Sequence, residues 1–141
     1  MLPIIIEAAI NFCLHQIRLP YDLLSASAKK RTLLAYIDFE TKDGEMHRAY
    51  IGCDEMLIQS IAEIFLGEED SDEETLSDML LETTNMIVGN AKVLAGELYE
   101  TAMTISTPFI LSDEECATLQ LDELQCIGIN GGEMTIGLQR L

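Results

Sequence analysis

Basic residues are scarce in this sequence. Its 141 residues include eight lysines and arginines against 25 aspartates and glutamates, which gives a formal net charge of −17. A surface this acidic repels nucleic-acid phosphates and anionic lipid headgroups. We therefore expect no nucleic acid and no membrane among the partners, and a protein surface that carries positive charge remains a plausible one.

Paired cysteine motifs are also missing. No CxxC occurs, and neither His15 nor His47 completes a zinc-ligand pattern, so no metal site is expected. The four cysteines stand singly, at Cys13, Cys53, Cys116 and Cys126. Two of them, Cys13 and Cys126, lie among apolar neighbours, which favours buried free thiols and a reducing compartment.

The sequence has no apolar run long enough to span a bilayer. The most apolar segment, residues 1–17, is short and is interrupted by Glu7. It also has no basic region before the apolar residues and no convincing cleavage site. We interpret this segment as a buried amphipathic helix and expect a cytoplasmic protein.

The residues that are present indicate one globular domain over residues 1–141, because 48% of them are hydrophobic and only 23% are charged. Pro3 suits a first helical turn, and Pro20 marks the end of that helix. The turn signals Asp43-Gly44 and Asn130-Gly131-Gly132 predict two hairpins. The hairpin segments are residues 32–52, and residues 118–129 with 134–141.

Two further helices and one strand lie between these hairpins. Asp54 can cap a helix whose apolar stripe comprises Leu57, Ile58, Ile61, Ile64 and Phe65. Residues 72–99 predict a long helix, and residues 101–111 a strand that Pro108 restricts to an edge or a strand end. Residues 112–115 read as a polar break. The predicted fold class is α+β: an antiparallel-rich sheet packed with two long helices and an N-terminal helix.

An acidic connector, residues 68–74, precedes the long helix. It lacks the central glycine and the ligand spacing of a calcium-binding loop, so a solvated turn is the better interpretation. Ser71 and Glu74 have the spacing of a capping box.

The long helix has two distinct faces. Its apolar residues gather on one side, and these are Leu76, Leu80, Ile87, Ala91, Leu94 and Leu98, with Met79 and Met86 flanking them. The opposite side carries Asp78, Glu82, Asn85, Gly89, Lys92 and Gly96. A glycine in a helix interior costs about 1 kcal/mol relative to alanine. Two glycines beside an acid and an amide therefore suggest that another molecule approaches this face closely.

The run Asp78-x3-Glu82-x2-Asn85-x22-Pro108 resembles the signature of the CheC, CheX and FliY family of chemotaxis phosphatases. CheC-like members carry two copies of this motif, and this chain has one. Its first helix has Glu7 and Asn11 with one residue too many between them, and Leu34 stands where a second proline is needed. A single motif in a short chain is similar to the CheX branch, whose members form homodimers by extending their sheets.

The resemblance implies that the protein dephosphorylates the aspartyl phosphate of a CheY-like receiver domain. Asn85 would position the attacking water, and Glu82 would pair with the lysine of the receiver. Asp78 and Gly89 would contact this partner, and Pro108 would be structural. The chain itself would bind no cofactor, because the receiver already holds Mg²⁺.

Two other interpretations remain open at this point. Gly89 is also compatible with close packing of two helices. A non-catalytic interaction module of the same fold, docking on a receiver or flagellar-switch protein, would need the same exposed helix.

Overall fold

Two glycine-containing turns build the centre of the fold. In the computed structural model, which describes residues 1–25 and 32–141, Gly44 and Gly131 have φ of 85° and 86°. Residues with a Cβ rarely adopt these angles, which suit tight hairpin turns. The hairpins are β2 (Thr32–Thr41) with β3 (Met46–Asp54), and β6 (Glu123–Ile129) with β7 (Gly132–Arg140). Both predicted hairpins are confirmed, and they join by antiparallel pairing of β3 with β7.

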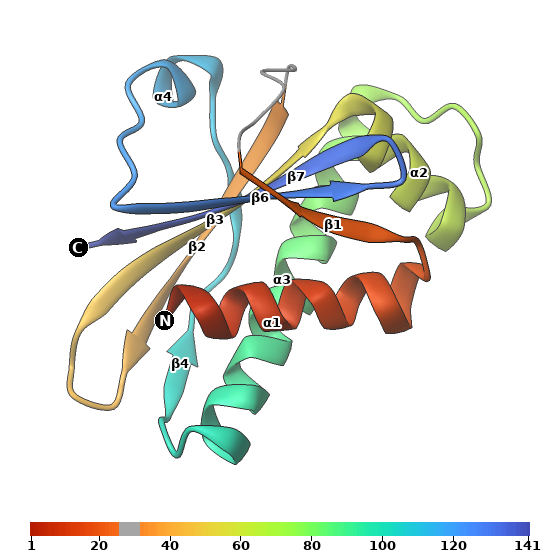
Figure 1. Ribbon diagram of the computed structural model, residues 1–141. Helices are drawn as coiled ribbons and strands as arrows, with labels where there is room; N and C mark the ends of the chain where they lie inside the picture. Colours follow the sequence, from red (N-terminus) through yellow and green to blue (C-terminus); the bar gives the residue numbers. More distant parts are fainter. Residues whose placement is uncertain (26–31) are drawn as a thin grey trace.

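Three short strands complete a seven-stranded sheet of order β1-β6-β7-β3-β2-β4 (Figure 1). They are β1 (Tyr21–Leu24), β4 (Met103–Ile105) and β5 (Phe109–Ile110). The segment with Pro108 lies at a sheet edge, as predicted, with β4 and β5 on either side of the proline and both paired with β2. Strand β1 was not predicted; it has four residues and, in the part of the chain that the structure describes, pairs with β6 alone.

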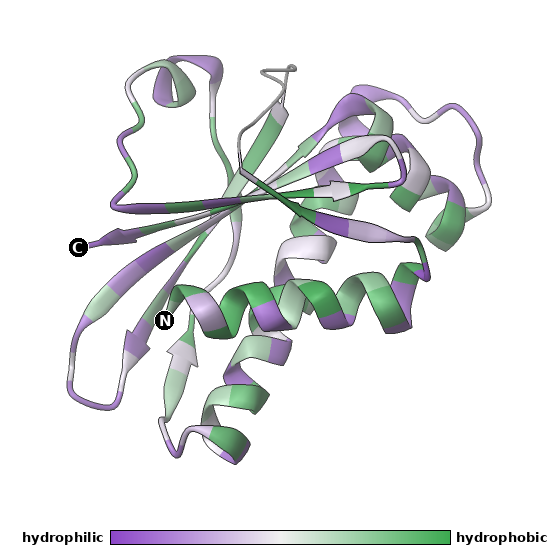
Figure 2. Cartoon of the chain, in the orientation of Figure 1, coloured by the Kyte–Doolittle hydropathy of each residue, from purple (hydrophilic) through white to green (hydrophobic). Residues whose placement is uncertain are grey.

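The helices on one face of the sheet bury the core (Figures 1 and 2). They are α1 (Leu2–Asn11), η1 (Phe12–Ile17, a π-helix), α2 (Glu55–Leu66) and α3 (Glu73–Leu98). Alternate strand residues such as Ile37, Ile51 and Ile136 are fully buried beneath them. Each such side chain contributes roughly 1.5–3 kcal/mol through removal from water. The predicted α+β class, with an antiparallel sheet against three helical segments, is confirmed.

The opposite face of the sheet carries the remaining short helix, α4 (Asp113–Ala117), and the chain after it. Gly137 points to this face because its neighbours Ile136 and Leu138 belong to the core. A Cβ at Gly137 would lie 2.5 Å from the side chain of Leu121, which therefore packs directly over the strand.

Helix caps were predicted with mixed success. The Asp54 carboxylate accepts a hydrogen bond from the Leu57 amide at 2.9 Å, as expected. The Ser71 capping box was wrong: Asp72 caps α3 by accepting from the Thr75 amide at 2.8 Å. Ser71 cannot cap because it is buried, and the Gln59 side chain holds its backbone at both N–H and C=O.

The polar break predicted at residues 112–115 was also wrong, because these residues begin α4. Ser112 and Glu115 form a reciprocal capping box there. In addition, three predicted core residues near helix ends are exposed. Ile64, Phe65 and Leu98 are 43, 37 and 61% exposed, because the last turns of α2 and α3 extend past the residues that cover their earlier turns.

Candidate functional site on helix α3

Helix α3 places the four predicted site residues on one outward-facing row. Asp78, Glu82 and Asn85 are exposed and Gly89 is partly exposed, and we call these four residues the α3 stripe. The opposite side of the helix is buried through Leu80, which is fully enclosed. At 1.5 Å per residue the stripe is about 16 Å long, and Glu82 and Asn85 are about 4.5 Å apart along the axis.

Two buried threonines mark the inward side of this part of the helix. Thr83 and Thr84 stand between Glu82 and Asn85 in the sequence, and both are fully buried. Their hydroxyls donate at 2.8 Å to the backbone carbonyls of Met79 and Leu80. Both hydroxyls are therefore hydrogen-bonded although the side chains are buried. Because these neighbours point inward, Glu82 and Asn85 point to solvent.

The polar groups of the α3 stripe are available to a partner. Within residues 1–25 and 32–141, the side chains of Asp78, Glu82 and Asn85 make no hydrogen bond or ion pair. Lys92 is the sole basic residue in the sequence of α3, so the stripe is acidic towards its N-terminal end. Along the helix, a partner would meet the carboxylates of Asp78 and Glu82, then the Asn85 amide, and then the open backbone at Gly89.

The space over Gly89 is empty. A Cβ built at this position has no described atom within 4 Å. Gly89 therefore packs against no other helix within the described residues. The glycine leaves a shallow place on the helix surface beside Asn85.

Helix α1 does not provide a second copy of the stripe. Its candidate residues are engaged with α3: Glu7 accepts from the Tyr99 hydroxyl at 3.1 Å, and Asn11 donates to Asn90 Oδ1, also at 3.1 Å. These contacts were not predicted, because no local pattern indicates that residues 92 and 79 positions apart will meet. They tie α1 across α3 (Figure 1).

The cysteines and acidic residues do not form a site. All four cysteines are free, and Cys13, Cys53 and Cys126 are buried. Burial raises the pKa of the Cys13 thiol to about 11 and also raises that of Cys53, so neither is a reactive thiolate near neutral pH. No three His, Cys, Asp or Glu side chains in the described part of the chain are placed to hold a metal ion. No helix within these same residues is both long and apolar enough to cross a bilayer.

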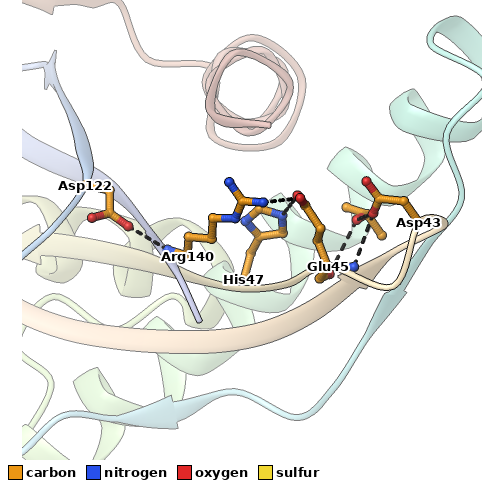
Figure 3. A network of polar contacts seen from close by, with 6 residues as sticks. Asp43, Glu45, His47, Asp122 and Arg140 are labelled. Carbon is orange, nitrogen blue, oxygen red and sulfur yellow. Dashed lines mark hydrogen bonds and ion pairs between the residues drawn. The ribbon is translucent and has the colours of Figure 1, made fainter.

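A concavity of about 1150 Å³ lies at the sheet end that holds the β2–β3 turn and the end of β7. None of the α3 stripe residues lines it. Figure 3 shows that several of its charged groups pair with one another: Arg140 with Glu45, the Arg140 amide with Asp122 at 2.7 Å, and His47 with Glu45 at 3.5 Å. Hydrogen bonds from the Thr41 hydroxyl and the Glu45 amide lower the pKa of Asp43. This network stabilises the end of the sheet.

Solved structures share this architecture over the whole chain. The chemotaxis protein CheX from Vibrio vulnificus matches with a TM-score of 0.81 and 20% identity, covering 99% of this chain and 95% of that one. CheX of Borrelia burgdorferi, solved in a complex with CheY, BeF₃ and Mg²⁺, matches with a TM-score of 0.68 and 14% identity, over 98% and 96%. FliY from Thermotoga maritima matches with a TM-score of 0.61 and 16% identity, covering 97% of this chain and 84% of that one.

Sequence comparison identifies the family. No curated protein sequence matches the chain. The family model described as chemotaxis phosphatase CheX matches residues 37–130, well over half of the chain, and this range contains the whole α3 stripe and Pro108. The chain therefore belongs to the CheX family of chemotaxis phosphatases.

Proposed function

We propose that this protein hydrolyses the aspartyl phosphate of a CheY-like receiver domain, and that the α3 stripe enters the phosphorylation site of that partner. The observation that carries the proposal is the pair Glu82 and Asn85, which are exposed side by side and have no hydrogen-bond or ion-pair partner among the described residues. The neighbouring Thr83 and Thr84 are fully buried on the inward side of the same helix. Family membership supports the activity, and the crystallised CheX–CheY complex supports the class of partner.

Hydrolysis of an aspartyl phosphate needs few catalytic groups from the phosphatase. The oxygen of a water molecule forms the new bond to phosphorus, and the bond from phosphorus to the aspartyl oxygen breaks. The leaving group is an aspartate carboxylate, whose conjugate acid has a pKa of about 4, so it departs as an anion without a general acid. A group that holds the water in line is sufficient, and Asn85 offers a donor and an acceptor on one planar amide.

Glu82 and Asp78 have positioning roles in this proposal. Glu82 lies one helical turn before Asn85, and its carboxylate would pair with the lysine of the receiver. Asp78, a further turn away, would lie at the rim of the contact. Mg²⁺ would belong to the receiver, since none of the proposed steps needs a cofactor on this chain.

The proposal is tested by following loss of phosphoryl label from a receiver with and without the protein. Acceleration of this loss supports a phosphatase. Binding to a receiver that carries a non-hydrolysable phosphoryl mimic, without acceleration, would instead support the docking module.

Gly89→Ala separates partner contact from helix stability. The added methyl enters open space, and alanine improves helix propensity by about 1 kcal/mol, so the melting temperature should rise. If the receiver approaches this backbone closely, affinity for the receiver should fall despite the higher stability. Gly96→Ala is the matched control: its Cβ also meets nothing within 4 Å, and it lies about 16 Å along the axis from Asn85. Equal receiver affinity for Gly89→Ala and Gly96→Ala would remove Gly89 from the contact.

We further propose that the protein forms a two-fold dimer, at least partly through sheet edges. Among the described residues, strand β1 pairs on one side only, and Leu23 within it is 56% exposed. Unpaired strand edges of this kind associate readily. Light scattering at tens of micromolar, an order-of-magnitude concentration for a weak interface, should give the dimer mass. Leu23→Lys should shift this mass towards the monomer, and a parent protein that is monomeric at that concentration would contradict the proposal.

A further inference from the structure

A polar groove of about 380 Å³ runs between α1, η1 and α3. Its floor includes the buried residues Ala8 and Phe12. Its walls carry Asn11, His15 and Gln16 on one side, and Met86 and Asn90 on the other. A groove formed by these residues was not predicted, because they come together only through the crossing of two distant helices.

The groove is continuous with the α3 stripe. Met86 follows Asn85 in the sequence and lies one turn beyond Glu82, and Asn90 follows Gly89. Asn85 and Asn90 are about 7.5 Å apart along the helix axis. A molecule that contacts Asn85 and Gly89 therefore reaches the edge of the groove without any change in the fold.

The shape of the groove depends on the π-helix. Residues Phe12–Ile17 continue α1 with the wider π turn, and this segment ends at Arg18, whose φ is 55°. Such segments are rare and occur frequently at functional sites. Here the turn carries His15 and Gln16, both exposed, to the wall that faces α3.

The groove offers hydrogen-bonding side chains, among them the amides of Asn11, Gln16 and Asn90. The bond from Asn11 to Asn90 uses one polar group of each amide and leaves an acceptor on Asn11 and a donor on Asn90. His15 and Gln16 make no side-chain hydrogen bond within residues 1–25 and 32–141. Side-chain amides pair equally well with a peptide N–H and a peptide C=O, so this groove suits main chain better than a charged side chain.

We infer that the groove receives the main chain of an exposed loop of the same receiver domain whose phosphoryl group Asn85 faces. This inference rests on the proposed function and extends it: the α3 stripe provides the chemistry, and the groove provides additional affinity and selects the partner by the shape of its loop. The groove contacts atoms that do not react, so it binds the substrate and the transition state equally. Its loss should therefore raise KM and leave kcat unchanged.

The test is the double variant His15→Ala/Gln16→Ala, compared with Gln120→Ala. The control removes the same type of exposed side chain from the segment before β6, on the other face of the sheet. We expect the double variant to keep the parental melting temperature. Its Kd for a receiver with a non-hydrolysable phosphoryl mimic, and its KM for dephosphorylation, should rise about tenfold, as expected for two lost neutral hydrogen bonds. The control should match the parent.

The outcomes distinguish the groove from the proposed function. If the double variant has the Kd and KM of the parent, the inference that the groove binds the receiver is wrong. The phosphatase proposal would still stand in that case if the parent accelerates dephosphorylation. A fall in kcat at unchanged KM would also overturn it, as would a changed oligomer mass with unchanged receiver affinity. If the parent binds the receiver without accelerating hydrolysis, the phosphatase proposal fails and the Kd comparison still decides the groove. A parent that does not bind receivers would overturn both.

Discussion

Asn85→Ala is expected to slow receiver dephosphorylation about a hundredfold while leaving receiver binding unchanged. The substitution deletes the amide that orients the attacking water but keeps Glu82 and the open surface at Gly89. Alanine is the better helix former, so α3 should be at least as stable as in the parent. An interaction made chiefly in the transition state lowers kcat and kcat/KM together, and this pattern is the expected signature.

The measurement for Asn85→Ala pairs a dephosphorylation time course with a binding curve on the phosphoryl mimic. Lys92→Ala is the matched control, because it truncates another exposed residue of the same helix and has no role in the proposed mechanism. If Asn85→Ala accelerates dephosphorylation as the parent does, water positioning by this amide is wrong.

Glu82→Lys is expected to weaken receiver binding by several kcal/mol, since it places two like charges together at the contact. The fold should survive because the residue is exposed and makes no contact that the substitution would break. Glu97→Lys changes the same charge at another exposed position of α3, about 22 Å along the axis from Glu82. Titration calorimetry with the receiver should therefore show a large loss for Glu82→Lys and a small one for Glu97→Lys. Equal losses in the two variants would mean that overall charge, and not a pair with Glu82, governs binding.

The parts of the fold that local sequence dictates were predicted well. The glycine turns at Gly44 and Gly131 and the Asp54 cap each depend on a few adjacent residues, and each occurs where expected. Strand β1 and helix α4 were missed for a different reason. Strand β1 is stabilised by its pairing with β6, about 100 residues away, and α4 has five residues and none of them is buried.

The candidate site also has features that local sequence predicts and features that depend on distant contacts. Helical periodicity alone places Asp78, Glu82, Asn85 and Gly89 on one row, and the structure has this arrangement. The contacts of Glu7 and Asn11 with α3 depend on how two helices cross, which no local pattern encodes. The same crossing creates the groove beside the stripe.

The central claim is catalysis by this chain, and turnover tests it most directly. A small amount of the protein is mixed with an excess of phosphorylated receiver, and inorganic phosphate is followed over time. The account predicts release of many equivalents of phosphate per protein, at a rate proportional to protein concentration and well above that of the receiver alone. Phosphate release at the rate of the receiver alone, in the presence of measurable binding to the phosphoryl mimic, would contradict it.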